Sequence, residues 1–359
     1  MAPLQNFIPG PSQLYFTVQD HVKKALKEGI PSISHRSKQF ERIFQETTEG
    51  IRELLSLPEN YSIYFTGSAT EIWERIVQNL VHESSLHFVN GAFSKRFYET
   101  ARQYHKDAVL IEVEPGHGFD HTHIPEIETE LVAVTHNETS TGVCLPTAFI
   151  DQLKEKNPAA LVAVDAVSSL PYVALNYTQV DTVFFSVQKG FGLPAGLGVW
   201  LANEKCLAKA ERLLTQGQAI GAYHNLLSLH DHARKNQTPE TPNVLGIYLL
   251  GQVVQDMLRR GLTAIRRETD YKAAILYQLL SDHPRMHAFV QQKEYQSKTV
   301  LTIVCANEYE NIYKVLEDNR IVPGEGYGSF RHDHLRIANF PAHSKEQFEL
   351  LVDILNTLK

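Results

Sequence analysis

The chain has 359 residues, of which 43% are hydrophobic and 21% charged, a balance typical of soluble globular proteins. Its 34 basic and 41 acidic residues give a net charge of −7 without any run of Lys or Arg, and its three cysteines form no CxxC pair, which argues against nucleic-acid binding, a disulfide framework and a cysteine zinc site. With no leader segment and no apolar stretch long enough to span a bilayer, we expect a cytoplasmic protein without membrane partners.

The first two thirds of the chain alternate between helical and strand patterns. Apolar residues recur at helical spacing from Phe16 to Leu26 and from Phe40 to Leu55, with a polar loop at residues 33–38 between them. Short apolar runs then alternate with helical patterns, which predicts an α/β fold with a mainly parallel sheet covered on both faces. The predicted strands are residues 62–65, 85–89, 108–112, 130–135, 160–164, 182–187 and 198–201.

The last third of the chain predicts a second, smaller unit. Apolar helical patterns at 244–258 and 262–280 lead into strands near 299–304 and 335–339 and a closing helix at 345–358. We therefore expect three parts along the chain. They are an N-terminal segment (1–15), which we expect to pack with the small domain, a large domain (16–258) and a small C-terminal domain (259–359).

Lys189 and Asp165 both follow apolar runs and are candidates for chemistry. Lys189 comes after the run 183–188 and before a glycine-rich segment, and Asp165 ends the run 160–164. The stretch between them fits one helix and one strand, so both side chains would lie at the carboxyl ends of neighbouring strands, where open α/β sheets bind ligands. A lone lysine after a strand is usually a surface residue. A lysine and a carboxylate at neighbouring strand ends, however, are the pair that pyridoxal phosphate requires, because the amine condenses with the aldehyde and the carboxylate pairs with the pyridinium nitrogen.

A candidate phosphate site precedes this pair in the sequence. Residues 61–70 read as a strand, a Gly-Ser turn and a helix that begins near Thr70. A helix N-terminus offers unpaired N–H groups and a partial positive charge to a dianion. The same pattern also serves as an ordinary helix cap, so only its combination with Lys189 and Asp165 favours a site for the phosphate of the cofactor.

Several segments then resemble those of the class V aminotransferases of fold type I, and within that class those of the phosphoserine aminotransferases. The resemblance covers nearly the whole chain. Its segments are NFIPGPSQL (6–14), ISHRSK (33–38), HNETSTG (136–142), VDAVSS (164–169), QKGFGLPAG (188–196) and NQTP (236–239). It implies a large domain with a mainly parallel seven-stranded sheet plus a small α/β C-terminal domain. It also implies pyridoxal phosphate as cofactor and transamination between phosphoserine and 2-oxoglutarate, as in serine biosynthesis.

The resemblance also implies a role for individual residues. Lys189 and Asp165 would be the catalytic pair, and Arg336 would bind the α-carboxylate of the amino acid. His35 and Arg36 would bind the distal group of the substrate across the interface of a homodimer, and Arg331 could replace a C-terminal His-Arg pair of the family. The further cofactor-binding residues would be Ser68, Ala69, Phe93, Thr139 and Gln188, with Gln237 and Thr238 from the second subunit.

The sequence departs from the family pattern at three places. Ser68-Ala69 stands where the family has Gly-Arg, NQTP stands where it has NNTP, and residues 324–331 are more similar to alanine– or serine–glyoxylate aminotransferases. An aminotransferase of that type is therefore the alternative. Alternatives of other classes are a lyase or desulfurase, which needs a reactive loop cysteine, and a non-catalytic relative of the same fold.

The excess of histidine does not predict a metal site. His117, His121 and His123 have a spacing that metal ligands also show, but they lie in a turn-rich loop without a helical context, and we expect a solvated loop there. His35 and Arg36, without the surrounding motif, would read as a surface pair. We therefore expect no resident metal.

Overall fold

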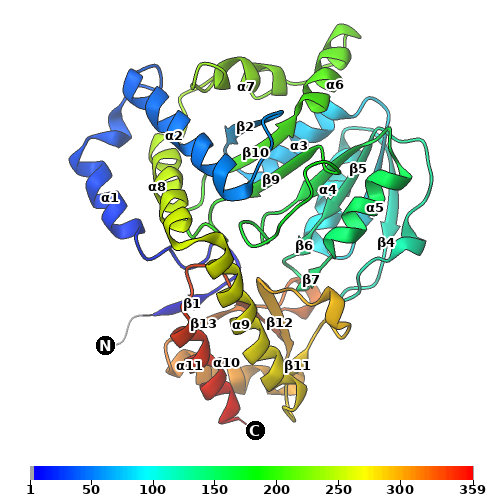
Figure 1. Ribbon diagram of the computed structural model, residues 1–359. Coiled ribbons are helices and arrows are strands. Elements are labelled where there is room, and N and C mark those ends of the chain that lie inside the picture. Colours follow the sequence, from blue (N-terminus) through cyan, green and yellow to red (C-terminus); the bar gives the residue numbers. More distant parts are fainter. Residues whose placement is uncertain (1–3, 359) are drawn as a thin grey trace.

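A seven-stranded sheet forms the centre of the computed structural model, which describes residues 4–358 (Figure 1). Strand β10 runs antiparallel to both of its neighbours, and all other pairs that the sheet contains are parallel. This confirms the α/β fold with a mainly parallel sheet, and each of the seven predicted strands is present. In spatial order the strands are β2 (Tyr61–Thr66), β10 (Gly198–Asn203), β9 (Thr182–Ser186), β8 (Leu161–Asp165), β5 (Leu131–Thr135), β3 (Ser84–Val89) and β4 (Asp107–Glu112).

Helices cover both faces of this sheet, because the central strands carry apolar side chains on both sides. In β9, Phe184 packs into one cluster with Trp73 of α3, whereas its neighbour Phe185 packs into the other cluster with Val254 of α8. Successive residues of a strand point to opposite faces, so a continuous apolar run needs two covering layers. One layer contains α3 (Ala69–Leu80), α4 (Ala92–Gln103), α6 (Glu204–Thr215) and α7 (Leu226–Ala233); the other contains α1 (Val18–Lys27), α2 (Lys38–Leu55), α5 (Thr147–Lys156) and α8 (Val244–Arg260).

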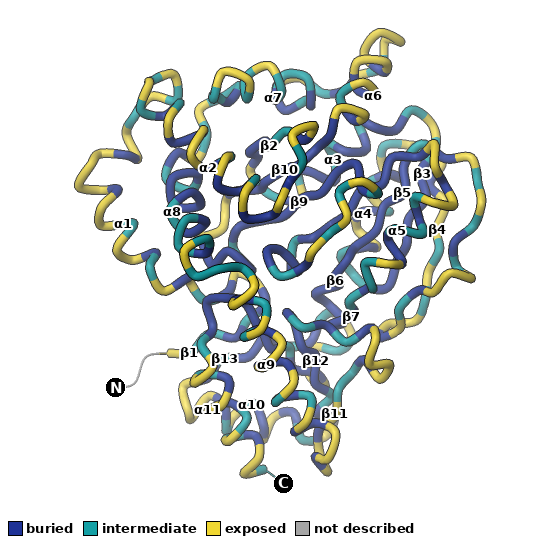
Figure 2. The backbone as a smooth tube through the Cα atoms, viewed as in Figure 1, coloured by how far each residue is buried: buried dark blue, intermediate teal, exposed yellow. Residues whose placement is uncertain are grey.

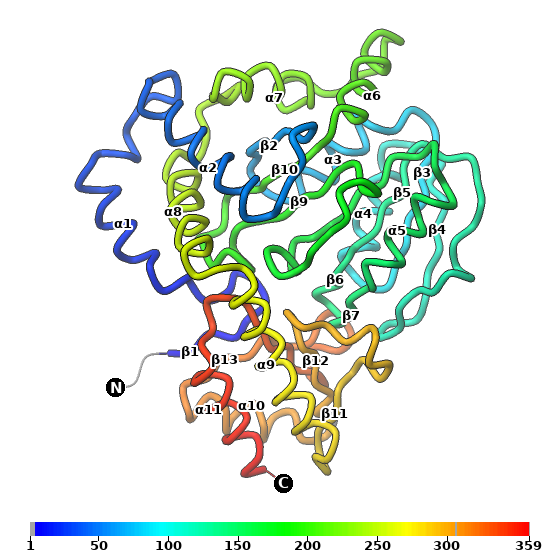
Figure 3. The backbone as a smooth tube through the Cα atoms, in the orientation of Figure 1, coloured from blue at the N-terminus to red at the C-terminus, as the bar shows by residue number. Residues whose placement is uncertain are grey.

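A five-stranded sheet forms from the two ends of the chain. Strand β1 (Gln5–Phe7) pairs in parallel with β13 (Ile321–Glu325), so the first described strand lies beside one of the last (Figure 3). The remaining strands, in order, are β14 (His334–Ala338), β12 (Val300–Val304) and β11 (His287–Ala288). The helices α9 (Leu262–Ser281), α10 (Tyr309–Asp318) and α11 (Lys345–Asn356) share its apolar cluster. Short elements elsewhere are the hairpin β6 (Asn137–Glu138) and β7 (Val143–Cys144) and five 3-10 turns at 30–32, 121–123, 293–295, 306–308 and 328–330.

The predicted division of the chain at residues 15 and 258 stays a prediction, and residues 1–3 and 359 of the predicted parts lie outside the described residues. Buried backbone is concentrated in the two sheets, while α1, α6 and the outer loops are largely exposed (Figure 2). Among residues 4–358, no helix has the length and apolarity needed to cross a membrane.

The loop after β9 is packed too tightly to carry side chains at its glycines. A Cβ at Gly190 would lie 2.0 Å from the carbonyl oxygen of Leu170. Gly192 has a φ of +61°, and a Cβ there would lie 2.6 Å from the backbone nitrogen of Tyr15. The glycines on the carboxyl side of Lys189 therefore let this loop lie directly against two other backbone segments, which fixes the start of the lysine side chain.

Candidate active site

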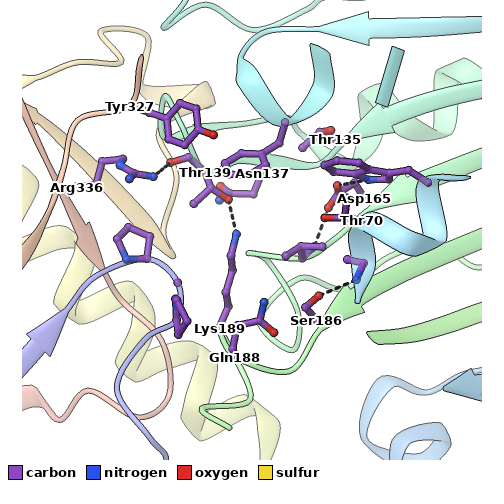
Figure 4. Close-up of a pocket in the computed structure, with 17 residues that line it drawn as sticks. Thr70, Thr135, Asn137, Thr139, Asp165, Ser186, Gln188, Lys189, Tyr327 and Arg336 are labelled. Carbon is purple, nitrogen blue, oxygen red and sulfur yellow. Dashed lines mark hydrogen bonds between the residues drawn. The ribbon is translucent and has the colours of Figure 1, made fainter. Parts of the chain in front are cut away.

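A cavity of about 210 Å³ lies at the carboxyl ends of β5, β8 and β9 (Figure 4). Residues from both sheets and from the N-terminal segment line it. They are Pro9, Gly10, Pro11, Ala69, Thr70, Trp73, Phe93, Thr135, Asn137, Thr139, Asp165, Val167, Ser186, Gln188, Lys189, Tyr327 and Arg336. Seven residues predicted from the sequence thus meet in one cavity: Lys189, Asp165, Ala69, Phe93, Thr139, Gln188 and Arg336.

Lys189 is buried and points into this cavity. Its Nζ donates a hydrogen bond to Thr139 Oγ1 at 2.9 Å and lies 5.1 Å from the centre of the Phe93 ring. Burial lowers the pKa of Lys189 to about 8, although the negative charges of Asp165 and Glu138 oppose this change. A lysine with this pKa has a substantial neutral fraction near physiological pH, and only the neutral amine is a nucleophile or a base.

Asp165 lies at the end of β8 and is held by two N–H donors. Its Oδ2 accepts a hydrogen bond from Trp73 Nε1 at 3.1 Å, and its Oδ1 accepts one from the backbone N–H of Val167 at 3.0 Å. Burial raises the pKa of Asp165 to about 6, and the hydrogen bonds and Lys189 oppose this change. At neutral pH the group is therefore still mostly a carboxylate, oriented by its donors and available to a protonated ring nitrogen.

The N-terminus of α3 forms one end of the cavity. The backbone N–H of Ala69 donates to Ser186 Oγ at 2.9 Å, and the side chain of Ser68 caps the helix by accepting from Glu71 N at 3.1 Å. Ser68 is not among the lining residues, since its hydroxyl serves the helix itself. The helix begins at Ala69, one residue earlier than predicted, because Ser68 is the cap. Helix N–H groups and the Ser186 hydroxyl make this end suitable for a phosphate.

The polar atoms of the cavity fit a bound cofactor. Thr135 Oγ1, Asn137 Oδ1 and Gln188 Oε1 are buried in its lining and have no hydrogen-bond partner within residues 4–358. Buried polar atoms normally have partners, so three such atoms around one cavity indicate a polar ligand. With the amine of Lys189, the carboxylate of Asp165 and the N-terminus of α3, the donor set matches the aldehyde, the ring nitrogen and the phosphate of pyridoxal phosphate.

Arg336 extends from β14 to the opposite side of the cavity. Its Nε donates to the carbonyl of Glu325 at 2.7 Å and its Nη1 donates to the carbonyl of Thr139 at 3.1 Å. Among the described residues, no carboxylate lies within ion-pair distance of its guanidinium. A largely buried cation without a carboxylate partner, which contacts the same Thr139 as Lys189, is suited to bind the carboxylate of a substrate.

The other predicted site residues lie outside this cavity. Four of them, His35, Arg36, Gln237 and Thr238, lie where the 33–38 loop meets the 236–241 loop. Arg36 Nη1 donates a hydrogen bond to Gln237 Oε1 at 2.6 Å, and His35 Nδ1 lies 3.3 Å from Thr241 Oγ1. Thr238, which donates to the carbonyl of Glu240 at 2.7 Å, is part of the same group. Arg331 is exposed and forms an ion pair with Glu325 at 2.6 Å. The roles of these residues stay predictions.

Several residues in and around the site were not predicted from the sequence, among them Trp73, Glu138 and Tyr327. Glu138 is fully buried beside the N-terminus of α4, where it accepts hydrogen bonds from the backbone and hydroxyl groups of Ser94 and Ser140. Its place in the HNETSTG segment was the available signal. Tyr327 lies in the loop after β13, within the 324–331 segment whose resemblance to other class V enzymes was the available signal. Trp73 is one apolar residue among several of α3, so nothing local marks it.

The loop with His117, His121 and His123 lies away from the cavity, beside a surface groove. His123 Nδ1 and Asp120 Oδ1 are 2.9 Å apart, within a capping arrangement of the 121–123 turn. Among residues 4–358, no group of three or more His, Cys, Asp or Glu side chains has a geometry that could hold a metal ion.

Comparison with known proteins supplies the family. The family model for aminotransferase class V matches residues 6–327. A phosphoserine aminotransferase of Rhodococcus opacus (strain B4) is 29% identical over 89% of this chain and 85% of its own length. The crystal structure of a phosphoserine aminotransferase from Cytophaga hutchinsonii shares 46% identity with a TM-score of 0.97, over 99% of both chains. An alanine–glyoxylate aminotransferase from Nostoc sp. has the same fold, with a TM-score of 0.79 at 21% identity over 100% of this chain and 96% of its own.

A buried lysine after one strand, a buried carboxylate at the end of the next strand and a helix N-terminus around one cavity define a pyridoxal-phosphate enzyme of fold type I. The chain belongs to the class V aminotransferases. It is therefore an enzyme that transfers amino groups, and pyridoxal phosphate is its cofactor. The resemblance seen in the sequence, to phosphoserine aminotransferases within this class, is confirmed.

Proposed function

We propose that this enzyme transfers the amino group of phosphoserine to 2-oxoglutarate, as a step of serine biosynthesis in the cytoplasm. The relatives that carry the name phosphoserine aminotransferase, one of them 46% identical over nearly the whole chain, support this substrate. The observation that supports an amino-acid substrate is the guanidinium of Arg336, which is largely buried, has no carboxylate partner among the described residues and contacts the same Thr139 as Lys189. All three cysteines are free, as expected in a reducing compartment.

Each residue of the cavity has a separate task in this proposal. When bound, pyridoxal phosphate supplies an aldehyde that condenses with amines and a ring that accepts electrons. Arg336 binds the α-carboxylate of the substrate through its paired N–H groups and thereby sets the orientation of the amino acid. Lys189 Nζ takes the proton from the Cα of the amino donor and, in the second half of the reaction, gives a proton to the Cα of the amino acceptor; its lowered pKa lets it do both near neutral pH.

Three further residues keep this arrangement in place. Asp165 stabilises a proton on the ring nitrogen, and Trp73 keeps the carboxylate turned toward the cavity. Phe93 covers one side of the lysine amine and limits the access of water. The N–H groups at the start of α3, with Ser186 and Gln188, are the groups that we assign to the phosphate.

We also propose a homodimer with shared active sites. His35, Arg36 and Gln237 are partly or fully exposed and lie outside the cavity of their own chain, as does Thr238, which is buried in the neighbouring loop. Their position outside that cavity supports a role in the cavity of a second copy. In a symmetric dimer the same loops would serve both sites. His35 and Arg36 would then bind the distal phosphate of the substrate, and Gln237 and Thr238 would contact the phosphate of the cofactor.

A panel of amino donors tests the substrate. The holoenzyme is mixed with phosphoserine, serine, alanine or glutamate, and the half-reaction is followed by the change in the visible absorption of the lysine-bound cofactor. We expect phosphoserine and glutamate to react and serine to react poorly. Equal rates with serine and phosphoserine would overturn the proposal, and fast turnover of alanine or serine with glyoxylate would establish the alternative type of class V aminotransferase. Release of ammonia from one of these donors, or of sulfide from cysteine added as a further donor, would instead indicate a lyase or desulfurase.

Complementation between two inactive variants tests the shared sites. In a mixed dimer of Lys189→Ala and Arg36→Ala, one site carries both substitutions and the other carries neither. After unfolding and refolding together, random pairing should restore about a quarter of the wild-type activity. No recovery, with dimers verified by mass, would place Arg36 in the same site as Lys189 of its own chain or outside both sites.

A further inference from the structure

The mouth of the cavity carries a second arginine that neither the motifs nor the family resemblance singled out. Arg96 lies on α4, one turn after Phe93. Its guanidinium lies 5.6 Å from the centre of the Phe93 ring and 5.9 Å from that of Tyr327, and its Nη2 donates a hydrogen bond to the Tyr327 hydroxyl at 2.6 Å. Both rings line the cavity, whereas Arg96 itself does not. Arg96 therefore packs against the outer side of two residues that form the cavity wall.

The charge of Arg96 is not neutralised by this chain. The side chain is exposed, and among residues 4–358 no carboxylate lies within ion-pair distance of it. Its neighbour Lys95, by contrast, lies 3.8 Å from Glu112, and Arg331 is paired with Glu325. A guanidinium has five N–H donors, and the described residues accept only one of those of Arg96.

Arg96 and Arg336 lie near the same ring. The guanidinium carbon of Arg336 is 5.4 Å from the centre of the Tyr327 ring, and that of Arg96 is 5.9 Å from it. Because the Tyr327 hydroxyl accepts its hydrogen bond from Arg96, its own proton remains available to a ligand. The Tyr327 side chain therefore contacts both the largely buried cation of Arg336 in the cavity and the exposed cation of Arg96 at its mouth.

We infer that Arg96 and the Tyr327 hydroxyl bind the distal acidic group, a phosphate or a carboxylate, of the substrate whose α-carboxylate lies on Arg336. This assignment rests on the proposed function and deepens it. Arg96 supplies a cation from the same chain as Lys189, in addition to the His35 and Arg36 pair that we assign to the second subunit. Serine and alanine have no distal acid, so the contact contributes to selectivity and not to the turnover of every donor.

Charge removal at two adjacent positions tests this assignment. In Arg96→Gln, the ratio of kcat/KM for phosphoserine to kcat/KM for serine should fall about tenfold or more, as expected for the loss of a charge-assisted contact, and most of the change should be in KM. Tyr327→Phe, which removes only the hydroxyl, should lower the same ratio by a smaller factor. The matched control is Lys95→Gln, which removes one positive charge from the same turn of α4 and should leave the ratio unchanged within about twofold.

A binding measurement provides a readout that does not depend on turnover. Glutarate has two carboxylates and butyrate has one, and neither carries an amino group to transfer. Titration calorimetry of the holoenzyme should show that Arg96→Gln lowers the affinity for glutarate about tenfold relative to the affinity for butyrate. Lys95→Gln should lower neither affinity.

The outcomes separate this inference from the proposed function. If the wild type prefers phosphoserine and Arg96→Gln keeps both that preference and the glutarate affinity, the role of Arg96 is overturned and the proposed function stands. If Arg96→Gln lowers kcat/KM equally for phosphoserine and serine, the role of Arg96 is also overturned, since Arg96 would then only hold Tyr327 in place. A wild type that does not prefer phosphoserine, but whose glutarate affinity falls in Arg96→Gln, overturns the proposed function alone.

Discussion

Replacing Lys189 by Met should make the cofactor-free protein more stable at neutral pH, although it removes the residue on which activity depends. Met has a similar length and carries no charge, so the substitution mainly removes a buried ammonium group. A fall of the Lys189 pKa from 10.5 to about 8 corresponds to about 3 kcal/mol at roughly 1.36 kcal/mol per pKa unit. This is the cost of keeping the buried amine charged, after the attraction of Asp165 and Glu138 is included.

The hydrogen bond from Lys189 to Thr139 opposes this gain. Its loss costs about 1 kcal/mol, so the variant should be more stable than the wild type by about 2 kcal/mol at pH 7. The lowered pKa means that the cost is present below pH 8 and disappears as the pH rises from about 8 toward 10.5. The stability of the variant relative to the wild type should therefore fall over this range, and at its upper end the variant should be less stable than the wild type by about 1 kcal/mol.

Urea unfolding of the cofactor-free proteins at pH 7 and pH 10, at one protein concentration, measures this difference. Lys95→Met is the matched control, because the side chain of Lys95 is 54% exposed and its charge remains solvated; its effect should stay within about 0.5 kcal/mol. A Lys189→Met protein that is less stable than the wild type at pH 7 would refute the reasoning, as would a difference between the two proteins that does not change with pH.

Three other substitutions have definite expected effects. Arg336→Lys should lower kcat/KM by about 10- to 100-fold for every amino donor alike, because all donors share the α-carboxylate; an effect confined to one donor in the panel would contradict its assignment. Glu138→Gln should lower the free energy of unfolding by about 3 kcal/mol, since an amide cannot accept all the hydrogen bonds that this buried carboxylate accepts, and a loss below about 1 kcal/mol in urea unfolding would contradict that. Gly190→Ala should cost about 3 kcal/mol or more, because its Cβ would lie 2.0 Å from a backbone oxygen; a wild-type melting temperature would show that the loop can move aside.

Much of the fold and the centre of the site could be predicted from local patterns. Continuous apolar runs marked the strands, and parallel strands place their carboxyl ends at one edge of a sheet, which is why Lys189 and Asp165 could be paired without a structure. The contribution of α3 could be predicted for a similar reason, since a cap followed by a helix is visible in a few residues.

The rest of the site depends on contacts between segments that are far apart in the sequence. Trp73 is a site residue only because α3 packs beside the end of β8, and an apolar residue in a helix carries no sign of this. Tyr327 reaches Arg96 across 231 positions of the chain. Arg331 was predicted only as a replacement for a C-terminal His-Arg pair of the family; the structure pairs it with Glu325 at the surface, and its role in substrate binding stays a prediction.

The pairing of β1 with β13 constrains the order in which the chain can assemble. Gln5 pairs with Ile321, so during synthesis β1 has no strand partner until β13, far along the chain, has been made. Just after β1, residues 9–11 form part of the cavity wall, and Ser12 donates a backbone hydrogen bond to Gln188, beside Lys189, at 2.9 Å. Such long-range contacts are slow to form. A chain that stops before β13 would thus be left with an open cavity, even with the whole central sheet and its lysine already synthesised.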